Sequence, residues 1–312
     1  MKVFNKIIIS KKYRRSSLAI GNFDGIHKGH QKIFEKANNF AKKYRSKFGI
    51  LTFSPLPVMF FNKKIKNYRL TSEDEKFRLL KKFHVDFVFN IKFNRSFSKT
   101  SAKNFIKNII YKKINPNRIF VSNNFKFGHK RKGNLFLLKK FEKKYNYKLI
   151  KINPFKHKKK IISSTRIRKL LQNGNINLTN KLLGKTWSID GHVIKGKKLG
   201  RKLGYRTCNI RIRNYILPKA GIYSVKVQIK KQKKLHSGVA YIGTRPTFKG
   251  KEIFLEIYIF GIKKNLYRNK LRVYFVKFIR SDKKFNNPSG LVRQMNKDVI
   301  LAKKGLKGKM VI

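Results

Sequence analysis

The sequence predicts two domains: an N-terminal α/β domain built on a parallel sheet, and a C-terminal all-β domain that is an antiparallel barrel or sandwich. A length of 312 residues is enough for two hydrophobic cores. Strand and helix patterns alternate along the first half. From residue 187, closely spaced strand patterns follow without helices between them. We place the boundary at Gly184 and expect domains at residues 1–184 and 185–312.

The α/β pattern begins with an apolar strand at residues 18–20 and an amphipathic helix at residues 30–44, whose apolar side carries Ile33, Phe34 and Ala37. Ser72 is followed by three acidic residues, a pattern typical of a capped helix start, so a second helix is expected from there to Phe83. Further strands are expected at residues 48–53, 85–91, 118–121 and 147–152, and further helices at residues 102–111, 135–145, 164–172 and just before Gly184. This alternation favours a parallel sheet covered on both faces.

The second half contains six strand patterns, at residues 187–194, 208–212, 223–229, 235–242, 253–260 and 271–279. Because no helix pattern separates them, antiparallel pairing is expected. A closing helix is expected at residues 290–303, where Leu291, Met295 and Val299 share one side.

The composition predicts a globular cytoplasmic protein. Hydrophobic residues make up 41% and aromatic residues 13% of the chain, enough to build cores. No apolar run approaches the roughly 20 residues that span a bilayer, and the N-terminus lacks the pattern of a secretory signal. The one cysteine, Cys208, cannot form an intramolecular disulfide, which fits a reducing compartment. We expect no membrane partner.

The net charge of +68, from 80 basic and 12 acidic residues, raises the alternative of a nucleic-acid-binding protein. Basic residues are spread over both halves, however, and Lys, Asn, Ile, Phe and Tyr, all with A/T-rich codons, are abundant. We attribute the charge to a base-composition bias, as a hypothesis. No zinc knuckle or RNP-like motif is present, so no specific nucleic-acid partner is expected. Because such a bias removes most carboxylates, one that remains in a strand or a glycine-rich turn is expected to be kept there by structure or function.

The sharpest motif, GNFDGIHKGH at residues 21–30, lies between the first strand and the first helix. In an α/β sheet this position binds phosphate, because the helix N-terminus favours an anion. Glycines let the backbone approach a triphosphate, and His27 and His30 can donate hydrogen bonds to it. A zinc pair is the alternative, but no third ligand has recognisable spacing. The residues assigned to this site are Gly21, Phe23, Asp24, Gly25, His27, Gly29 and His30.

Three further segments accompany this motif: TFSPLP at residues 52–57, FKFG at residues 125–128 and ISSTRIR at residues 162–168. In the last, serine or threonine hydroxyls can cap a helix while Arg168 forms a fork on phosphate; a plain capped helix is the alternative. With these motifs the chain resembles the bifunctional prokaryotic riboflavin kinase/FAD synthetase family over nearly its whole length. The resemblance assigns ATP or phosphate binding to Ser163, Ser164, Thr165 and Arg168, and flavin binding to Thr52, Phe53, Pro55, Pro57, Asn124 and Phe125.

The second half is similar to the riboflavin kinase part of that family at residues 191–196 and 200–209. There the glycine-rich connection folds over the ATP phosphates, which assigns Gly196, Gly200 and Gly204 to ATP. Thr207 and Asn209 match its magnesium-coordinating residues. Glu256, in an apolar strand where an unpartnered carboxylate is costly, matches the general base; a solvent-facing position is the alternative. This chain has Arg206, Tyr241, Tyr258 and Arg268 where the family has Pro, Asn, His and Gly.

The resemblance implies a nucleotidylyltransferase domain of Rossmann-like fold, followed by a six-stranded antiparallel barrel with a terminal helix. It implies ATP-dependent phosphorylation of riboflavin to FMN, then adenylyl transfer from ATP to FMN to give FAD. Mg²⁺ is the implied metal, and riboflavin, FMN and ATP are the implied small-molecule partners. Two alternatives stay open: a nucleotidylyltransferase with a degenerate kinase half, and the basic nucleic-acid-binding protein.

Overall fold

The computed structural model describes the chain apart from residues 8–10, 197–199, 201–202, 231, 233, 248–249, 263 and 308–312, and apart from the side chains of residues 244–247 and 250–252. Contacts divide the chain into two compact units. Unit 1 comprises Met1–Lys66 and Glu73–Ser163, and unit 2 comprises Asn67–Ser72 and Ser164–Ile312. Each unit is described by itself below.

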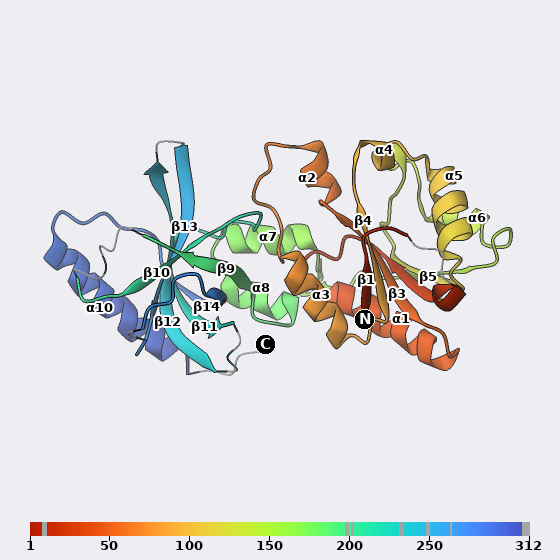
Figure 1. The fold of residues 1–312 in the computed structure, drawn as a ribbon. Helices are drawn as coiled ribbons and strands as arrows, with labels where there is room; N and C mark the ends of the chain where they lie inside the picture. The colour runs from red at the N-terminus through yellow and green to blue at the C-terminus, as the bar shows by residue number, and fades with distance from the viewer. Residues whose placement is uncertain are drawn as a thin grey trace. The chain divides into compact units, whose positions relative to one another are not determined.

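Unit 1 is built on a six-stranded sheet in the order β1-β4-β3-β2-β5-β6, in which all neighbours are parallel (Figure 1). Its strands are β1 (Lys2–Phe4), β2 (Ser17–Ile20), β3 (Phe48–Ser54), β4 (Phe87–Lys92), β5 (Arg118–Ser122) and β6 (Lys148–Ile152). The chain runs from β2 through β3 to β4, and then returns to form β5 on the other side of β2. The strand order therefore reverses at β2, where doubly wound sheets bind ligands outside the carboxyl ends of their strands.

Helices cover both faces of this sheet because alternate strand residues point to opposite sides. Leu18 and Ile20 of β2 enter one core, and Ala19 enters the other. The core containing Ala19 is covered by α1 (Lys28–Lys43) and α3 (Glu73–Lys82). The core containing Leu18 is covered by α5 (Ala102–Asn104), the π-helix η2 (Phe105–Ile114) and α6 (Leu135–Lys140). The remaining short elements of unit 1 are η1 (Lys11–Tyr13), α2 (Pro57–Phe61), α4 (Arg95–Ser98), η3 (His129–Arg131), β7 (Lys156–His157) and β8 (Lys160–Ile161).

The parallel sheet and its flanking helices confirm the predicted fold, with local differences. The edge strand β1 was not predicted, because a three-residue strand with Lys2 and Val3 exposed shows no hydrophobic alternation. The helix predicted at residues 102–111 reaches Ile114, mostly as a π-helix, and its C-cap Asn115 has a φ of 48°. The helix predicted to reach Tyr145 ends at Lys140.

Unit 2 contains a closed barrel in the order β10-β13-β12-β11-β14-β9, with antiparallel neighbours throughout. Its strands are β9 (Ser188–Ile194), β10 (Thr207–Arg211), β11 (Gly221–Ile229), β12 (Leu235–Thr247), β13 (Gly250–Ile259) and β14 (Lys270–Arg280). Before the barrel come α7 (Ser164–Gln172) and α8 (Ile176–Leu183), and after it comes α10 (Pro288–Gly305). The barrel, rather than the sandwich, is therefore the correct alternative, and the predicted terminal helix is present.

Residues 67–72, which we call the strap, belong to unit 2 although the chain on both sides of them belongs to unit 1. The Tyr68 and Arg69 amides both donate to the carbonyl of Asn214, at 3.0 and 2.8 Å. The indole nitrogen of the buried Trp187 donates to the Leu70 carbonyl at 2.8 Å. The contacts thus place α7, α8 and the strap in unit 2, while the domain boundary at Gly184 remains a prediction about functional domains.

Two bidentate ion pairs hold the barrel and its terminal helix. Arg272 of β14 binds Asp190 of β9 through N–O distances of 2.7 and 2.8 Å. Arg280 of β14 binds Asp298 of α10 at 2.8 and 2.7 Å, and Asp298 also accepts from Gln294 at 3.0 Å. The two side chains of the second pair are only 16% and 3% exposed. Such buried, hydrogen-bonded pairs are costly to break at one partner.

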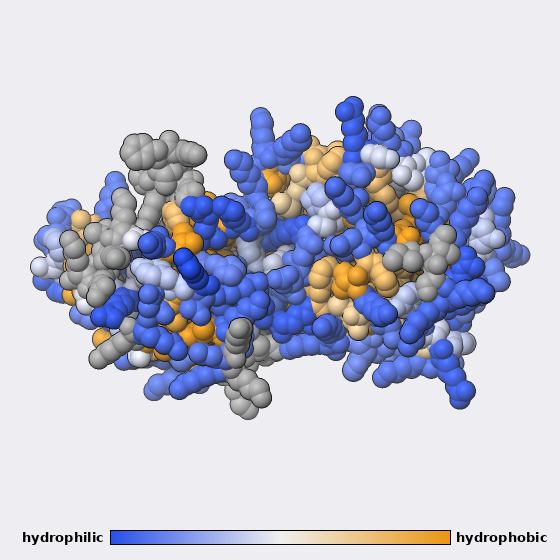
Figure 2. Space-filling model, in the orientation of Figure 1, coloured by the Kyte–Doolittle hydropathy of each residue, from blue (hydrophilic) through white to orange (hydrophobic). Residues whose placement is uncertain are grey.

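Hydrophilic side chains dominate the face shown in Figure 2, with smaller hydrophobic areas between them. None of the helices that the structure describes is long and apolar enough to span a membrane.

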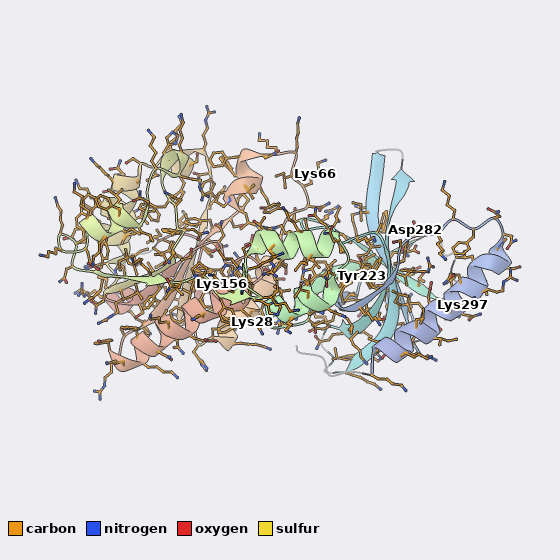
Figure 3. The ribbon with its side chains drawn as sticks, turned by 180° about the vertical axis from the view of Figure 1, so that it is seen from behind. Lys28, Lys66, Lys156, Tyr223, Asp282 and Lys297 are labelled. Atoms are coloured by element: carbon orange, nitrogen blue, oxygen red, sulfur yellow. The ribbon has the colours of Figure 1, made fainter. Side chains whose placement is uncertain are left out.

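We expect Asp298→Asn to lower the free energy of unfolding of unit 2 by about 2–4 kcal/mol, because Arg280 would keep a buried charge without its carboxylate. Urea unfolding followed by circular dichroism measures this change. Lys297→Met is the matched control, since Lys297 is an exposed neighbour on α10 (Figure 3) and should change stability by less than about 0.5 kcal/mol. Equal effects of the two substitutions would contradict the importance of the pair.

Candidate functional site

The loop after β2 has a backbone that few side chains adopt. Phe23, Gly25 and Ile26 have φ values of 47°, 86° and 43°. For a residue other than glycine this conformation costs about 1–2 kcal/mol. The Phe23 and Ile26 side chains are 2% and 0% exposed in the core between β2 and α1, so packing holds the loop in this shape. Backbone strain kept in place by buried anchors is typical of functional loops.

The two histidines of the motif are fixed against each other at the start of α1. His27 is the N-cap, and its Nδ1 accepts a hydrogen bond from the His30 amide at 3.4 Å. The two rings stack with centroids 3.6 Å apart, and the His30 ring meets Phe23 edge-on at 5.2 Å. A Cβ on Gly29 would lie 3.1 Å from the His27 ring, so glycine keeps the turn open there. Because Nδ1 accepts, a neutral His27 carries its proton on Nε2, which becomes a donor.

The residues predicted to bind flavin lie at the ends of the two strands that flank β2. Thr52 of β3 is fully buried, and its hydroxyl donates to the Asn22 carbonyl at 3.1 Å. Phe53 packs beside Phe97 with ring centroids 5.5 Å apart. Asn124, which follows β5, accepts a 2.8 Å hydrogen bond from Ser122. Pro55 and Pro57 follow β3, with Pro57 opening α2, and Phe125 stacks on Phe127 at 5.5 Å. Unit 1 thus brings the histidine loop and the predicted flavin residues to the carboxyl ends of three adjacent strands.

The fourth motif divides between the units. Ser163 ends unit 1, whereas Ser164, Thr165 and Arg168 belong to unit 2, where α7 begins at Ser164. Arg168 is buried, and its guanidinium lies 3.7 Å from the ring centroid of Tyr68 in the strap. Its Nε donates to the Tyr68 carbonyl at 2.8 Å. This stacking fixes the plane of the guanidinium, which is the group predicted to bind phosphate.

In the barrel, strand register places the predicted kinase residues on one face. Asn209 of β10 pairs directly with Glu256 of β13, and Glu256 pairs with Tyr241 of β12. Side chains of directly opposed residues share a face of the sheet. Asn209 is 6% exposed, and its Oδ1 has no hydrogen-bond partner within the described part of the chain. A buried oxygen of this kind requires a partner, and a bound ligand can supply one.

The glycine-rich connection lies close to Asn209. A Cβ at Gly196 would fall 2.2 Å from Asn209 Nδ2, and one at Gly200 would fall 3.2 Å from the Thr207 hydroxyl. Gly204 has a φ of 84°, a conformation that favours glycine. Lys197–Leu199, Arg201 and Lys202 of this predicted motif lie outside the described residues.

The four residues at which the kinase half departs from the family pattern fit their local surroundings. Arg268 keeps a φ of 64°, the conformation favoured by the glycine that it replaces, at a cost of about 1 kcal/mol. The Tyr241 hydroxyl donates to Asp282 at 2.8 Å, and Tyr258 packs edge-on against Tyr205 at 5.1 Å. Arg206 lines a cavity of about 310 Å³ beside Thr207, Cys208 and Tyr267. The substituted side chains therefore leave the register of Asn209 and Glu256 in place.

Comparison with known proteins shows the family to which this chain belongs. A family model described as FAD synthetase matches residues 9–166, and one described as riboflavin kinase matches residues 183–306. The bifunctional riboflavin kinase/FMN adenylyltransferase of Buchnera aphidicola subsp. Schizaphis graminum is 41% identical over 292 residues, 93% of each chain. The chain belongs to the bifunctional riboflavin kinase/FMN adenylyltransferase family. It therefore phosphorylates riboflavin to FMN and adenylylates FMN to FAD.

A further relative and a solved structure extend the comparison. The enzyme of the same description from Escherichia coli strain K12 is 33% identical over 286 residues, covering 92% of this chain and 91% of its own. A crystal structure described as a macrolide-efflux protein from Streptococcus pneumoniae aligns with a TM-score of 0.84 at 29% identity, over 97% of this chain and 99% of its own. That structure shares the fold along its length, and its description applies to that protein.

Three features beside the sites were not found from the sequence. They are the buried Lys76 of α3, the stacking of Tyr68 on Arg168, and the Asn209 oxygen that has no partner among the residues described. Only Lys76 had a detectable signal, because it precedes Leu79 and Leu80 by three and four positions and so shares their buried helix face. The other two depend on contacts between distant segments.

Cys208 provides a test of the cavity's environment, because burial raises the pKa of its thiol to about 11. The thiolate is the reactive form, and at pH 8 it should be only about one part in a thousand of the total. We expect iodoacetamide to label the native enzyme slowly at pH 8, tenfold faster for each added pH unit below the pKa, and rapidly in urea. Mass spectrometry measures one unambiguous site, since the chain has a single cysteine. Rapid native labelling at pH 8 would contradict a buried thiol.

Proposed function

We propose that the histidine loop of unit 1 carries out adenylyl transfer and that the Asn209–Glu256 pair of unit 2 carries out riboflavin phosphorylation. The observation that supports this proposal is their separation: the two sets of side chains lie in different compact units. Each reaction can then be abolished without the other. We also infer a cytoplasmic location, because both reactions consume ATP and the chain's single cysteine suits a reducing compartment.

In adenylyl transfer a phosphate oxygen of FMN bonds to the α-phosphorus of ATP, and the bond from that phosphorus to pyrophosphate breaks. We assign His27 and His30 as donors to the charge that develops on the phosphoryl oxygens, a role that requires fixed geometry. The capping bond and ring stacking of the two histidines supply this geometry. Gly21, Phe23, Asp24, Gly25 and Gly29 shape the phosphate loop. The assignment of Ser163, Ser164, Thr165 and Arg168 to phosphate stays a prediction from the family resemblance.

The flavin of FMN is assigned to the ends of β3 and β5. Thr52, Phe53, Pro55 and Pro57 come from the first segment, and Asn124 and Phe125 from the second. The aromatic rings of Phe53 and Phe125 supply apolar surface, while Asn124 supplies an amide for polar edges of the ligand.

In the kinase reaction the ribityl 5′-oxygen of riboflavin bonds to the γ-phosphorus of ATP, the bond from that phosphorus to ADP breaks, and the hydroxyl proton leaves. We assign Glu256 as the base that accepts this proton. Gly196, Gly200 and Gly204 shape the connection that covers the ATP phosphates. The close approach of this connection to Asn209 and Thr207 supports the assignment.

Mg²⁺ is the proposed metal of the kinase site, held by Thr207 and Asn209. The donor set fits, because the buried Oδ1 of Asn209 is an oxygen without a partner among the described residues, and Mg²⁺ prefers oxygen and takes few protein ligands beside substrate phosphates. When bound, the ion would neutralise charge on the transferring phosphoryl group. The protein's part is to position Glu256 across from Asn209.

We expect His30→Ala to lower FAD formation about 10²–10³-fold, because one donor to the transition state is lost. FMN should still accumulate when the variant receives riboflavin and Mg-ATP. Chromatography separates the three flavins and measures both steps in one reaction. His129→Ala, at an exposed histidine of the same unit, is the control and should form FAD normally. Undiminished FAD synthesis by His30→Ala would refute the assignment of the loop.

We expect Glu256→Gln to have the reciprocal effect, with FMN formation falling about 10²–10⁴-fold because glutamine cannot accept the proton. The same variant should convert supplied FMN to FAD at the wild-type rate. The measurement is again flavin chromatography, started once from riboflavin and once from FMN. If a folded Glu256→Gln enzyme lost both steps together, the assignment of two separate sites would be wrong.

A further inference from the structure

Lys76 is a buried lysine beside the adenylyl-transfer site to which the assignments above give no role. It lies in the first turns of α3 and is 1% exposed. Lysine is almost never fully buried unless its charge is paired or hydrogen-bonded, because its ammonium group is strongly hydrated. Leu79 and Leu80 share its buried helix face, so an apolar residue at position 76 would also suit the packing. The ammonium group therefore calls for an explanation other than core formation.

The ammonium of Lys76 joins two strands of the sheet at their carboxyl ends. Its Nζ lies 3.3 Å from the carbonyl oxygen of Asn22 and 3.3 Å from the hydroxyl oxygen of Thr52. The Thr52 hydroxyl in turn donates to the same Asn22 carbonyl at 3.1 Å. Asn22 is the second residue of the loop after β2, and Thr52 lies in β3. The three groups thus form a closed triangle between the histidine loop and the segment assigned to flavin.

Glu73, one helical turn before Lys76, binds the neighbouring strand ends. Its carboxylate accepts from the Ser54 hydroxyl of β3 and from the Asn90 amide of β4, the latter at 3.2 Å. The start of α3 therefore presents an acidic and a basic side chain to consecutive strand ends. Asn90 and Thr52 are 5% and 0% exposed, so these contacts are shielded from water. Hydrogen bonds to charged groups are stronger in such a buried environment than in water.

We propose that Lys76 is a positioning residue for adenylyl transfer. Its ammonium fixes the Asn22 carbonyl, and so the start of the strained loop at residues 23–26, in the geometry that receives the ATP phosphates. It also places a buried positive charge beside that loop. The low dielectric constant of the protein interior strengthens the attraction between this charge and a triphosphate. Lys76 exchanges no proton and forms no bond in the reaction. The inference rests on the assignment of residues 21–30 to phosphate binding.

The test compares Lys76→Met with Lys76→Gln in the full-length enzyme. Methionine keeps an unbranched stem but loses the charge and the donor, while glutamine keeps a donor without charge. For Lys76→Met we expect kcat of FMN adenylylation to fall about 10–100-fold. The KM for ATP and the inhibition constant of inorganic pyrophosphate should both rise severalfold, with the KM for FMN within twofold of wild type. The values of these constants for Lys76→Gln should lie between those of Lys76→Met and those of the wild type.

Riboflavin kinase activity on the same preparation reports whether each variant is folded, and Lys81→Met, at an exposed lysine of α3, is the matched control that should leave both activities unchanged. If Lys76→Met does not fold, Lys76→Gln decides the question in the same assays. Wild-type kcat and wild-type pyrophosphate inhibition in either folded Lys76 variant would overturn the proposal. A His30→Ala enzyme that still makes FAD would instead refute the phosphate-loop assignment, so the two failures are distinguishable.

Discussion

The shortage of negative charge is the constraint on which much of this structure depends. Only 12 carboxylates face 80 lysines and arginines, so repulsion among the basic residues opposes compaction. Several carboxylates of the described residues form ion pairs and hydrogen bonds that offset it locally. Asp190 and Asp298 hold bidentate arginine pairs in the barrel, and Asp86 accepts from both Lys47 and the Phe48 amide next to the sheet. Glu75 pairs with Arg78 within α3.

The location proposed for the adenylyl-transfer site follows from the topology of the parallel sheet. Because strand order reverses at β2, the loops after β2, β3 and β5 meet at one edge. Side chains far apart in the sequence, such as His30 and Phe125, therefore come from neighbouring strand ends of one rigid scaffold. The buried contacts of Glu73 and Lys76 bind the ends of β2, β3 and β4 to one helix. Such support is needed because small displacements of catalytic groups cost large factors in rate.

The barrel keeps the strand register of the proposed kinase residues, although several residues near them differ from the family pattern. Arg268 occupies a backbone conformation suited to glycine, and Tyr241 has gained a hydrogen bond to Asp282. Both changes are absorbed locally because register in a closed barrel is set by many inward-facing residues, such as Ile210, Leu255 and Ile257. The pairing of Asn209 with Glu256 is thereby kept. These sequence departures leave the residues proposed for the kinase reaction in register.

The sequence alone determined the fold class and the longer helices and strands, and it contains the motifs of both proposed sites, because these are encoded by local patterns: hydrophobic periodicity, glycine-rich turns and the spacing of His27 and His30. It did not predict the short elements α2, α4, β7 and β8. It missed β1, whose three residues acquire their strand structure only by pairing with β4. The strand pattern by itself left barrel and sandwich undecided, because both use the same alternating strands and differ only in closure; the family resemblance implied the barrel that the structure shows. Tertiary structure alone joined the strap at residues 67–72 to unit 2, stacked Tyr68 on Arg168 and carried the Lys76 ammonium to Asn22 and Thr52. These contacts bring together residues up to 146 positions apart, as between Tyr68 and Asn214, and no short-range pattern specifies which distant partner a buried polar group will find.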